Sequence, residues 1–499
     1  MEQTDFDVLI VGAGLSGIGA AVHLTKKCKG KSYAILEMRD ASGGTWDLFR
    51  YPGIRSDSDM HTLGYNFKPW DAQKAIADGP SILKYVRETA TEHGVDDHIR
   101  YGRKVLSADW DSHRAIWTVT ANGPDGEEVY TARWLHVCSG YYKYDAGYTP
   151  EFEGRDDFKG DVIHPQHWPE DYDYSGKNVV VIGSGATAMT LVPAMTDKAA
   201  HVTMLQRSPT YVVSRPSEDG VANAMRKIMP NKMAYGLTRW KNVLMQLFFY
   251  RMTRVRPNKV KDQLLGMVEE ELGPDYDIET HFTPSYNPWD QRLCLVPDSD
   301  LFIALKEKKA SVVTDHIDRF TEGGISLKSG ETLDADVIVT ATGLDLVWLG
   351  DMTLRVDGQT QTPHDLLNYR GAMFSNIPNL TAVFGYTNAS WTLRADLTSE
   401  YMCKVLRHMD KRSYIEARPI ADGVEATTDF LDFSSGYVQR AMKRFPRQAD
   451  EKPWVMTQNY ARDIFIMRHS KVEDGKLRFR KTGEAVRETR DEALAVAAE

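Results

Sequence analysis

Cysteine is scarce in this chain. Its 499 residues include only four cysteines, Cys28, Cys138, Cys294 and Cys403. Four cysteines are too few for a disulfide framework, and no two of them form the C-x-x-C pair that marks zinc sites and thioredoxin-type dithiols. The sequence therefore predicts no metal site and a reducing, cytoplasmic location.

Long apolar runs and an excess of basic residues are also missing. No stretch reaches the about 18 uninterrupted apolar residues that a membrane-spanning helix needs, and the N-terminus has acidic residues where a signal peptide would have basic ones. The net charge of -9 argues against nucleic acid as a partner, because binding to phosphates needs a basic surface. The composition, with 42% hydrophobic and 26% charged residues, is that of a soluble globular protein. The length predicts about two to four domains.

A glycine-rich turn near the N-terminus is typical of dinucleotide-binding proteins. Gly12, Gly14 and Gly17 form the pattern G-x-G-x-x-G between an apolar strand at residues 8–11 and a helix. The first glycine permits the sharp turn, the second lets a pyrophosphate approach the backbone, and the third lets the helix pack on the strand. Glu37 follows the next strand, where a carboxylate accepts both ribose hydroxyls and repels a 2′-phosphate. We predict an FAD or NAD site; a glycine turn with a chance acid is the alternative.

The same arrangement occurs a second time along the chain. Gly183, Gly185 and Ala188 take the three positions, and Arg207 with Ser208 stands where the first unit has an acid. A guanidinium and a hydroxyl suit a 2′-phosphate, because arginine binds phosphate through a bidentate fork. The second unit is therefore predicted to bind NADP, with an ordinary surface arginine as the alternative.

Each unit is followed by alternating strands that end in a buried strand and a glycine. These meanders lie at residues 115–140 and 324–343 and turn at Asn-Gly or Ser-Gly steps. We predict an α/β fold with two Rossmann-like dinucleotide-binding domains, for FAD and NADP, the second inserted in the first. The predicted parts are 1–145 and 339–499 for the FAD-binding domain, 146–216 and 286–338 for the NADP-binding domain, and 217–285 for a helical insert.

One region within the insert is strongly basic. Residues 221–261 contain ten Lys or Arg and no Asp or Glu, together with apolar stretches such as NVLMQLFFY. The periodicity is mostly helical, with interruptions at Pro230 and Pro257. We favour a helical cap over the substrate. A basic amphipathic element that makes weak peripheral contact with a membrane surface is the alternative.

Two longer motifs show which family the chain resembles. GGTWDLFRYPGIRSD at residues 43–57 matches G-G-x-W-x4-Y-P-G-x3-D, and FKGDVIHPQHWP at residues 158–169 matches F-x-G-x3-H-x3-W-P. Both are patterns of the type I Baeyer–Villiger monooxygenases, within the flavin-containing monooxygenase superfamily. Related N- and S-oxygenating enzymes lack the Trp-Pro ending. The resemblance runs from about residue 7 to residue 478 and is greatest to the ethionamide-activating members.

This resemblance implies an NADPH- and O2-dependent flavoprotein that inserts one oxygen atom next to a ketone carbonyl. In the family, FAD reduced by NADPH gives a C4a-peroxyflavin, which attacks the ketone to yield an ester or lactone. Sulfoxidation of thioethers and thioamides is the implied second activity, and a flavin monooxygenase acting mainly on sulfur or nitrogen is the alternative. The implied partners are a small-molecule ketone or sulfide and O2. The missing cysteine pair disfavours a disulfide reductase, and the two intact motifs disfavour a non-enzymatic NADPH-binding regulator.

The resemblance places the catalytic groups at Arg292 and Asp57. Arg292 matches the family's active-site arginine, and Asp57 matches the aspartate that positions it. A permanent cation about 4 Å from an anionic peroxide contributes about 4 kcal/mol at an effective dielectric near 20. A surface salt bridge is the alternative for Arg292, and a helix N-cap is the alternative for Asp57. Gln291 stands where many members have a lysine that holds the 2′-phosphate, so the preference for NADPH rests more heavily on Arg207 and Ser208.

The second motif carries His164, on the connection between the two domains. His167 alone does not complete a metal site. The resemblance implies that His164 belongs to a linker that changes position as the domains move. Direct catalysis by His164 is the alternative. Tyr386, Asn388 and Trp391 are candidates for contact with the substrate near the flavin.

The loops and the resemblance together assign the cofactor-binding residues. For FAD they are Gly12, Gly14, Ser16, Gly17 and Glu37 around the dinucleotide, Thr45, Trp46, Asp47 and Leu48 beside the isoalloxazine, and Val105 at the adenine. Asp57 is expected to lie by the flavin. For NADPH they are Arg55 and Ser56 at the nicotinamide half, with Gly183, Ser184, Gly185, Ala186, Thr187, Ala188, Arg207 and Ser208 around the phosphates.

Overall fold

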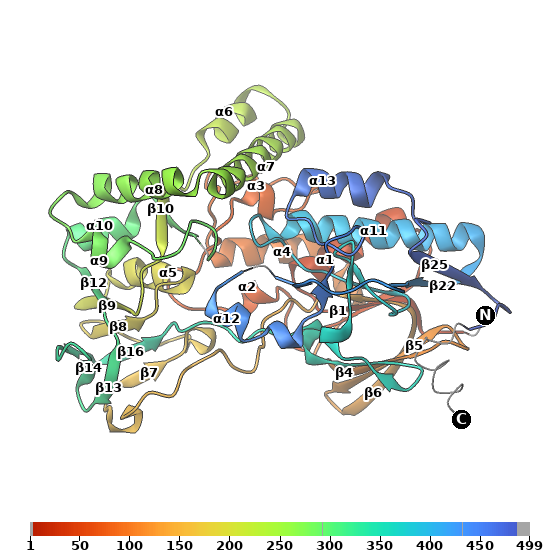
Figure 1. The fold of residues 1–499 in the computed structure, drawn as a ribbon, viewed down its shortest axis with the longest axis horizontal. Coiled ribbons are helices and arrows are strands. Elements are labelled where there is room, and N and C mark those ends of the chain that lie inside the picture. The colour runs from red at the N-terminus through yellow and green to blue at the C-terminus, as the bar shows by residue number, and fades with distance from the viewer. Residues whose placement is uncertain (1–2, 292, 432, 487–499) are drawn as a thin grey trace.

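Two sheets, each with its own glycine-rich turn, organise the molecule. The computed structural model describes residues 3–291, 293–431 and 433–486. One sheet is built from strands at both ends of the chain and the other from its middle, and they lie on opposite sides of the ribbon in Figure 1. The prediction of two Rossmann-like domains, the second inserted in the first, is confirmed.

The first sheet runs in the order β18-β17-β4-β5-β6-β1-β2-β3, with β21 added beside β6. At its centre, β1 pairs in parallel with β2 and β6. Alternate residues of β1 pack into different cores, Val8 and Ile10 on one face and Leu9 and Val11 on the other. Burial on both faces explains the unbroken apolar run. The strands are β1 (Phe6–Val11), β2 (Tyr33–Leu36), β3 (Ile99–Arg100), β4 (Lys104–Asp111), β5 (Ile116–Gly123), β6 (Gly126–Val137), β17 (Thr353–Val356), β18 (Gln359–Thr360) and β21 (Leu380–Ala382).

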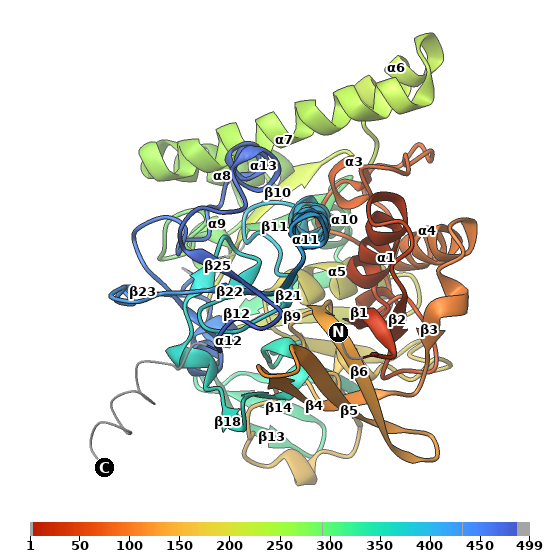
Figure 2. The ribbon, with the colours of Figure 1, turned by 90° about the vertical axis from the view of Figure 1, so that its right-hand side faces the viewer.

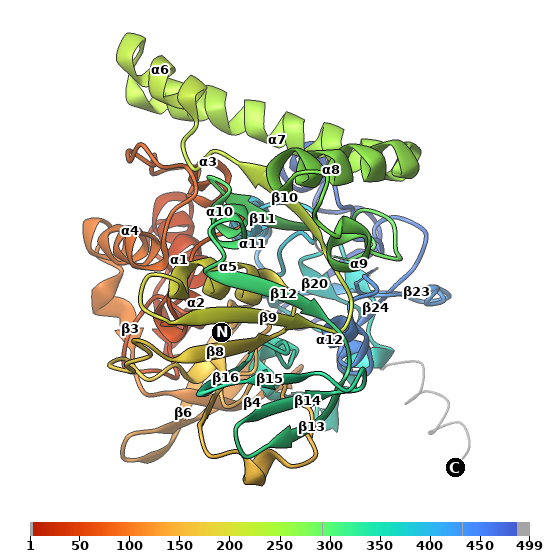
Figure 3. The same cartoon turned by 90° about the vertical axis from the view of Figure 1, so that its left-hand side faces the viewer.

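The second sheet has five parallel strands in the order β12-β9-β8-β16-β7. Figure 3 shows β12, β9, β8 and β16 side by side, with α5 and α10 above. The predicted domain boundary between residues 338 and 339 falls inside β16, which pairs with β8 along its whole length. The strands are β7 (Asp161–Ile163), β8 (Asn178–Ile182), β9 (His201–Gln206), β12 (Ala310–Thr314) and β16 (Val337–Thr340).

Helices cover both sheets, and smaller elements connect them. One hydrophobic core lies between β1 and helices α1, α4 and α11. Another lies between the second sheet and helices α5 and α10. The helices are α1 (Leu15–Lys27), α2 (Thr45–Leu48), α3 (Met60–Leu63), α4 (Gly79–Glu92), α5 (Ala186–Met195), α10 (Asp300–Lys306), α11 (Trp391–Arg412), α12 (Gly436–Gln439) and α13 (Tyr460–Ile464). The smaller sheets consist of β10 (Tyr211–Arg215) with β11 (Leu293–Pro297), β13 (Ile317–Thr321) with β14 (Gly324–Leu327) and β15 (Thr332–Asp334), β19 (Asn368–Tyr369) with β20 (Met373–Phe374), β22 (Tyr414–Pro419) with β25 (Leu477–Lys481), and β23 (Thr428–Asp429) with β24 (Arg447–Gln448).

A helical insert crosses one end of the molecule. It consists of α6 (Gly220–Ile228), α7 (Asn231–Val255), α8 (Pro257–Leu272) and α9 (Ile278–Phe282), and the helices break at Pro230 and Pro257 as predicted. Figures 2 and 3 show α7 along the outer edge, and α6 turns back to pack beside the first turns of α7, where Lys241 pairs with Asp219. Within the part of the chain that the structure describes, no helix is both long and apolar enough to cross a bilayer.

Candidate functional site

The two glycine-rich turns open into one cavity between the domains. The cavity has a volume of about 1200 Å³, and its walls include Gly12 and Gly14 from the first turn and Gly183 and Gly185 from the second. Asp57 lies in the same wall. The parallel strands that precede the two turns end at this cavity, which is where open α/β sheets bind their ligands.

The first turn has the close backbone contacts that its glycines predict. Gly12 adopts a φ of 99°, and a Cβ there would lie 2.7 Å from the carbonyl oxygen of Cys138. A Cβ on Gly17 would lie 1.8 Å from the carbonyl oxygen of Gly12, so only glycine lets α1 approach the strand. Helix α1 starts after Gly14 with no side-chain cap. Its first N–H groups are therefore available to a phosphate, as FAD requires.

Glu37 stands at the end of β2 in the cavity wall, close to Val105 on β4. Its carboxylate accepts N–H groups from Ala13 at 2.7 Å and from Arg39 at 2.9 Å. Burial raises the pKa of Glu37, and these N–H groups offset part of that rise. A buried carboxylate held in this way at the cavity wall suits the hydroxyls of a ribose.

The turn that begins α2 divides the predicted flavin contacts into two groups. Thr45 and Trp46 line the cavity, but Asp47 and Leu48 do not. The carboxylate of Asp47 is only 4% exposed and forms ion pairs with Arg39, Arg50 and Arg87, each at 2.7 Å. Asp47 therefore holds the turn in place from behind the cavity wall.

The next segment carries Asp57 and two predicted nicotinamide contacts. Arg55 and Ser56 both line the cavity, and Arg55 forms an ion pair with Asp300 of the second domain. The charge of Asp57, after burial, raises the pKa of Tyr51. Asp59, not Asp57, caps α3, because its side chain accepts the N–H of Thr62 at 3.1 Å. The structure thus does not support the N-cap alternative for Asp57.

The predicted catalytic residue Arg292 lies outside the described residues. Of its neighbours in the sequence, Gln291 and Cys294 line the cavity. Among the described residues, no group of three or more His, Cys, Asp or Glu side chains could hold a metal ion.

The second turn is more open than the first. Helix α5 starts after Gly185 with no side-chain cap, and a Cβ on Gly185 would meet no atom within 4 Å. Ser184, Ala186 and Thr187 also line the cavity, whereas Ala188 is fully buried beneath it. This open N-terminus suits the pyrophosphate of NADP.

Arg207 and Ser208 follow β9 at the rim of the same cavity. The exposed guanidinium of Arg207 has no hydrogen bond or ion pair with any described residue. The carbonyl oxygen of Ser208 accepts the hydroxyl of Ser184 at 3.0 Å, which fixes the loop beside the glycine turn. An arginine available in this place suits a 2′-phosphate.

His164 lies where the two connections between the domains cross, and it does not line the cavity. Its Nδ1 accepts the N–H of Gln166 at 3.2 Å, so its Nε2 donates to the carbonyl oxygen of Gly343 at 3.3 Å. Burial lowers the pKa of His164, which favours this neutral form. Gln166 in turn donates to the carbonyl oxygens of Lys143 and Tyr144 at 2.8 and 2.9 Å. The histidine therefore joins the connections, as the motif predicts, and does not contact the reacting groups in this structure.

Of the three predicted substrate contacts, Tyr386 and Trp391 line the cavity and Asn388 does not. Trp391 donates its indole N–H to the hydroxyl of Ser16 at 2.8 Å, which links α11 to the first glycine turn. The sequence reading missed much of the aromatic wall, to which Tyr141, Tyr142, Tyr144, Tyr148, Tyr286 and Tyr437 contribute. The adjacent tyrosines after the glycine that ends the first meander were the available signal.

The helical insert does not cover this cavity. No described residue between 217 and 285 belongs to its wall, so the expected cap over the substrate is absent from this structure. The physical reason is that α7 packs beside α3 instead. Arg239 and Asn242 bind residues 59–64, and Tyr235 and Val243 join the hydrophobic core of the first domain.

Comparison with known proteins gives two family matches. Residues 70–261 match the model of flavin-binding monooxygenase-like proteins, and residues 10–72 match that of the NAD(P)-binding Rossmann-like domain. The FAD-containing monooxygenase EthA of Mycobacterium tuberculosis is 52% identical over 479 residues, which are 95% of this chain and 98% of EthA. The probable FAD-binding monooxygenase AlmA of an Acinetobacter species is 48% identical over 97% of this chain and 98% of its own.

Solved structures share the fold at lower identity. An oxidized steroid monooxygenase bound to NADP has a TM-score of 0.77 and 22% identity, covering 95% of this chain and 99% of its own. The cyclohexanone monooxygenase from Rhodococcus sp. Phi1 bound to NADP+ has a TM-score of 0.70 and 21% identity, covering 84% and 87%.

Proposed function

The chain belongs to the family of FAD-containing monooxygenases, and from that premise we propose that it is a Baeyer–Villiger monooxygenase. The prediction of FAD and NADPH as cofactors is confirmed for this family. The proposed reaction converts a ketone, O2, NADPH and a proton into an ester or lactone, NADP+ and water. Sulfoxidation of thioethers and thioamides is the proposed second activity. The four cysteines are buried, and we place the enzyme in the cytoplasm.

The observation that carries the proposal is the structural role of the motif at residues 158–169. Its glycine, Gly160, packs so closely that a Cβ would lie 2.2 Å from the carbonyl oxygen of Asp336. Its tryptophan, Trp168, is 8% exposed and packs edge-on against Tyr172 and Tyr174. These contacts anchor the motif in the second domain.

Gln166 of the motif donates to the carbonyl oxygens of Lys143 and Tyr144 on the connection from the first domain, so the motif links the two cofactor-binding domains. Its Trp168 is buried, whereas Pro169 is exposed. This supports the Baeyer–Villiger branch over its N- and S-oxygenating relatives.

Both cofactors fit the residues present. FAD, reduced by NADPH and reacted with O2, supplies the oxygen atom that is transferred. Gly12, Gly14 and Glu37 would hold its pyrophosphate and ribose, with Thr45 and Trp46 beside the ring system. Tyrosine side chains and Trp391 restrict water at the reacting end of the cavity.

NADPH binds the opposite wall in this proposal. Gly183 and Gly185 would hold its pyrophosphate at the start of α5, and Arg207 with Ser208 would hold the 2′-phosphate. Arg55 would have to loosen its ion pair with Asp300 to contact the nicotinamide half.

Charge compensation in the reaction is assigned to Arg292 and Asp57. Arginine stays protonated throughout, so it can stabilise an oxyanion that forms beside it, and Asp57 orients the guanidinium. At about 4 Å and an effective dielectric near 20, such a pair contributes about 4 kcal/mol, or roughly three orders of magnitude in rate.

Product analysis with the purified holoenzyme tests the proposal. A linear methyl ketone, phenylacetone and methyl p-tolyl sulfide are incubated with NADPH and labelled O2, while NADPH and peroxide are followed. An ester with one labelled oxygen atom is expected. Arg292→Ala should abolish ester formation with FAD still bound, whereas the matched control Arg355→Ala, which breaks a surface pair with Asp109, should not. Sulfoxide without ester would instead favour heteroatom oxygenation, and absence of any NADPH oxidation would contradict the assignment as an enzyme.

A further inference from the structure

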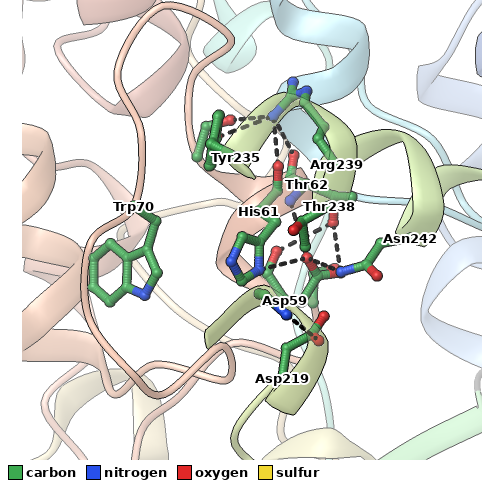
Figure 4. A network of polar contacts seen from close by, with 12 residues as sticks. Asp59, His61, Thr62, Trp70, Asp219, Tyr235, Thr238, Arg239 and Asn242 are labelled. Atoms are coloured by element: carbon green, nitrogen blue, oxygen red, sulfur yellow. Dashed lines mark hydrogen bonds and ion pairs between the residues drawn. The ribbon is translucent and has the colours of Figure 1, made fainter. Parts of the chain in front are cut away.

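One face of helix α7 packs against the protein. Arg239 donates from Nη1 to the carbonyl oxygens of His61 at 2.9 Å and Gly64 at 2.7 Å (Figure 4). One turn further on, Asn242 donates to the carboxylate of Asp59 at 2.9 Å. Arg239 and Asn242 are buried, at 6% and 9% exposure. These bonds fix the rotation of α7 about its axis, so most of its opposite face points away from the protein. Trp240 is the exception, because its ring lies 6.0 Å from that of Tyr460.

That opposite face is apolar. Residues 233, 237, 240, 244, 248 and 255 recur at helical spacing and form one stripe, about 33 Å long for 22 residues at 1.5 Å per residue. Nine of the fourteen large hydrophobic side chains that are exposed among the described residues belong to α6 and α7. The stripe consists of Met233 (53% exposed), Leu237 (48%), Trp240 (45%), Leu244 (57%), Phe248 (68%) and Val255 (64%).

Basic side chains surround the stripe. Residues 221–261 contain ten Lys or Arg and no acid, although the chain as a whole has a net charge of -9. Five of these cations are exposed and form no ion pair with any described residue. Repulsion from Lys232, in addition to burial, lowers the pKa of the neighbouring Lys26. The five are Lys227, Lys232, Arg251, Arg256 and Lys259.

We propose that α6 and α7 dock the enzyme on an anionic lipid surface. A long helix with an apolar stripe, an aromatic residue in it and cations beside it lies in the interface of a bilayer, with the apolar side chains among the acyl chains and the cations at the headgroups. A second copy of this chain fits less well, because pairing the same face of two molecules would bring two sets of unneutralised cations together.

Vesicle co-sedimentation of the full-length holoenzyme tests this surface. We expect binding to an equal mixture of phosphatidylcholine and phosphatidylglycerol, weak binding to phosphatidylcholine alone, and loss of binding at high salt. The double substitution Leu244→Gln with Phe248→Gln should weaken binding at least about tenfold. Its matched control is Val129→Gln with Ile303→Gln, two exposed hydrophobic residues elsewhere, which should change nothing.

Charge is tested separately. Arg256→Gln with Lys259→Gln should weaken binding about 25-fold, since each cation near an anionic surface contributes about fivefold. Lys159→Gln with Lys328→Gln removes two exposed lysines from the second domain and should leave binding unchanged.

The depth to which the apolar stripe enters the bilayer is measured with a fluorescent label. All four native cysteines are buried, so Leu244→Cys can be labelled selectively with an environment-sensitive dye. Its emission should shift to the blue on addition of the anionic vesicles, and that of Val129→Cys should not. Equal binding by the Leu244→Gln with Phe248→Gln variant overturns the proposal. So does absence of vesicle binding together with a dimer that this variant dissociates, because the occupant is then a second copy.

Discussion

Replacing Arg239 with methionine should destabilise the enzyme more than removal of any exposed cation on the same helix. The guanidinium is 6% exposed and holds three carbonyl oxygens of residues 61–64 through one nitrogen (Figure 4). Its other terminal nitrogen lies 3.5 Å from the carboxylate of Asp396, which is 1% exposed and also accepts His23 at 2.9 Å. Methionine keeps much of the volume but leaves the carbonyls and one carboxylate oxygen of Asp396 without this cation.

Breaking a buried pair in this way costs about 3–5 kcal/mol. At about 2.1 cal/mol/K per residue, unfolding of 499 residues as one unit has an entropy of about 1 kcal/mol/K, so the expected fall in Tm is about 3–5 °C. Bound flavin and NADPH oxidation should fall as well, because residues 61–64 follow the segment that carries Asp57 at the cavity.

Differential scanning fluorimetry of the holoenzyme measures the shift, and flavin absorbance measures cofactor content. Arg251→Met, on the outer face of α7, is the matched control and should change stability by less than about 0.5 kcal/mol. Arg239→Lys should lose less stability than Arg239→Met, because lysine keeps the positive charge, although it lacks the forked guanidinium. If the Tm of Arg239→Met lies within about 1 °C of the wild-type Tm, which is about a quarter of the expected fall, the buried network does not anchor the insert.

Three further outcomes follow from the site and the cores. Gly17→Ala should release FAD, because the new Cβ would lie 1.8 Å from the carbonyl oxygen of Gly12. The control Gly266→Ala in α8, where a Cβ meets no atom within 4 Å, should retain FAD. Flavin absorbance after gel filtration measures the bound FAD of both variants. Arg207→Gln should raise KM for NADPH by about 10- to 100-fold and leave KM for NADH nearly unchanged, as steady-state kinetics would show. Burial lowers the pKa of His136 to about 3, so below its unfolded pKa of about 6.5 only the unfolded state gains a proton. Stability should therefore fall by up to about 1.4 kcal/mol per pH unit between about pH 6.5 and 3, and His136→Asn should flatten that slope in denaturant titrations.

Both dinucleotide loops could be predicted from the sequence because their chemistry is backbone chemistry. A glycine is required wherever a Cβ would meet another backbone atom, as at Gly12 and Gly17, and that requirement depends only on local spacing. The position of His164 was also predictable, because its motif lies between two recognisable units. In each case the decisive neighbours were in or next to the motif itself.

Other roles depended on contacts that are remote in the sequence. Asp47 lies in the flavin motif, but Arg87, forty residues away, shares its carboxylate with two other arginines and keeps it behind the wall. Asp57 and Asp59 are two residues apart, and only the hydrogen bond to Thr62 shows which of them caps α3.

The insert was misread for a different reason. The usual expectation is that the apolar face of a helix packs inward, and it predicted a cap over the cavity. In α7 the inward face carries Arg239 and Asn242, and the apolar stripe faces outward. Periodicity locates the two faces of a helix, but not which of them the rest of the chain will cover.

The contacts of the insert also indicate where the two domains can move relative to each other. Helix α7 is held to the first domain by the buried cation Arg239, whereas Val260 and Leu264 of α8 pack against β10 and Val268 packs into the core of the second domain. The C-terminal part of α7 also contacts the second domain, because Phe249 and Met252 pack against the cluster that contains β10 and Arg254 forms an ion pair with Asp290. Any such motion must therefore bend α7 between Arg239 and these residues or break one set of contacts. His164 can yield at the other connection, since a neutral imidazole can exchange one hydrogen bond without stranding a charge. A closure that brings Arg207 and the flavin side together would therefore involve both α7 and the connection at His164.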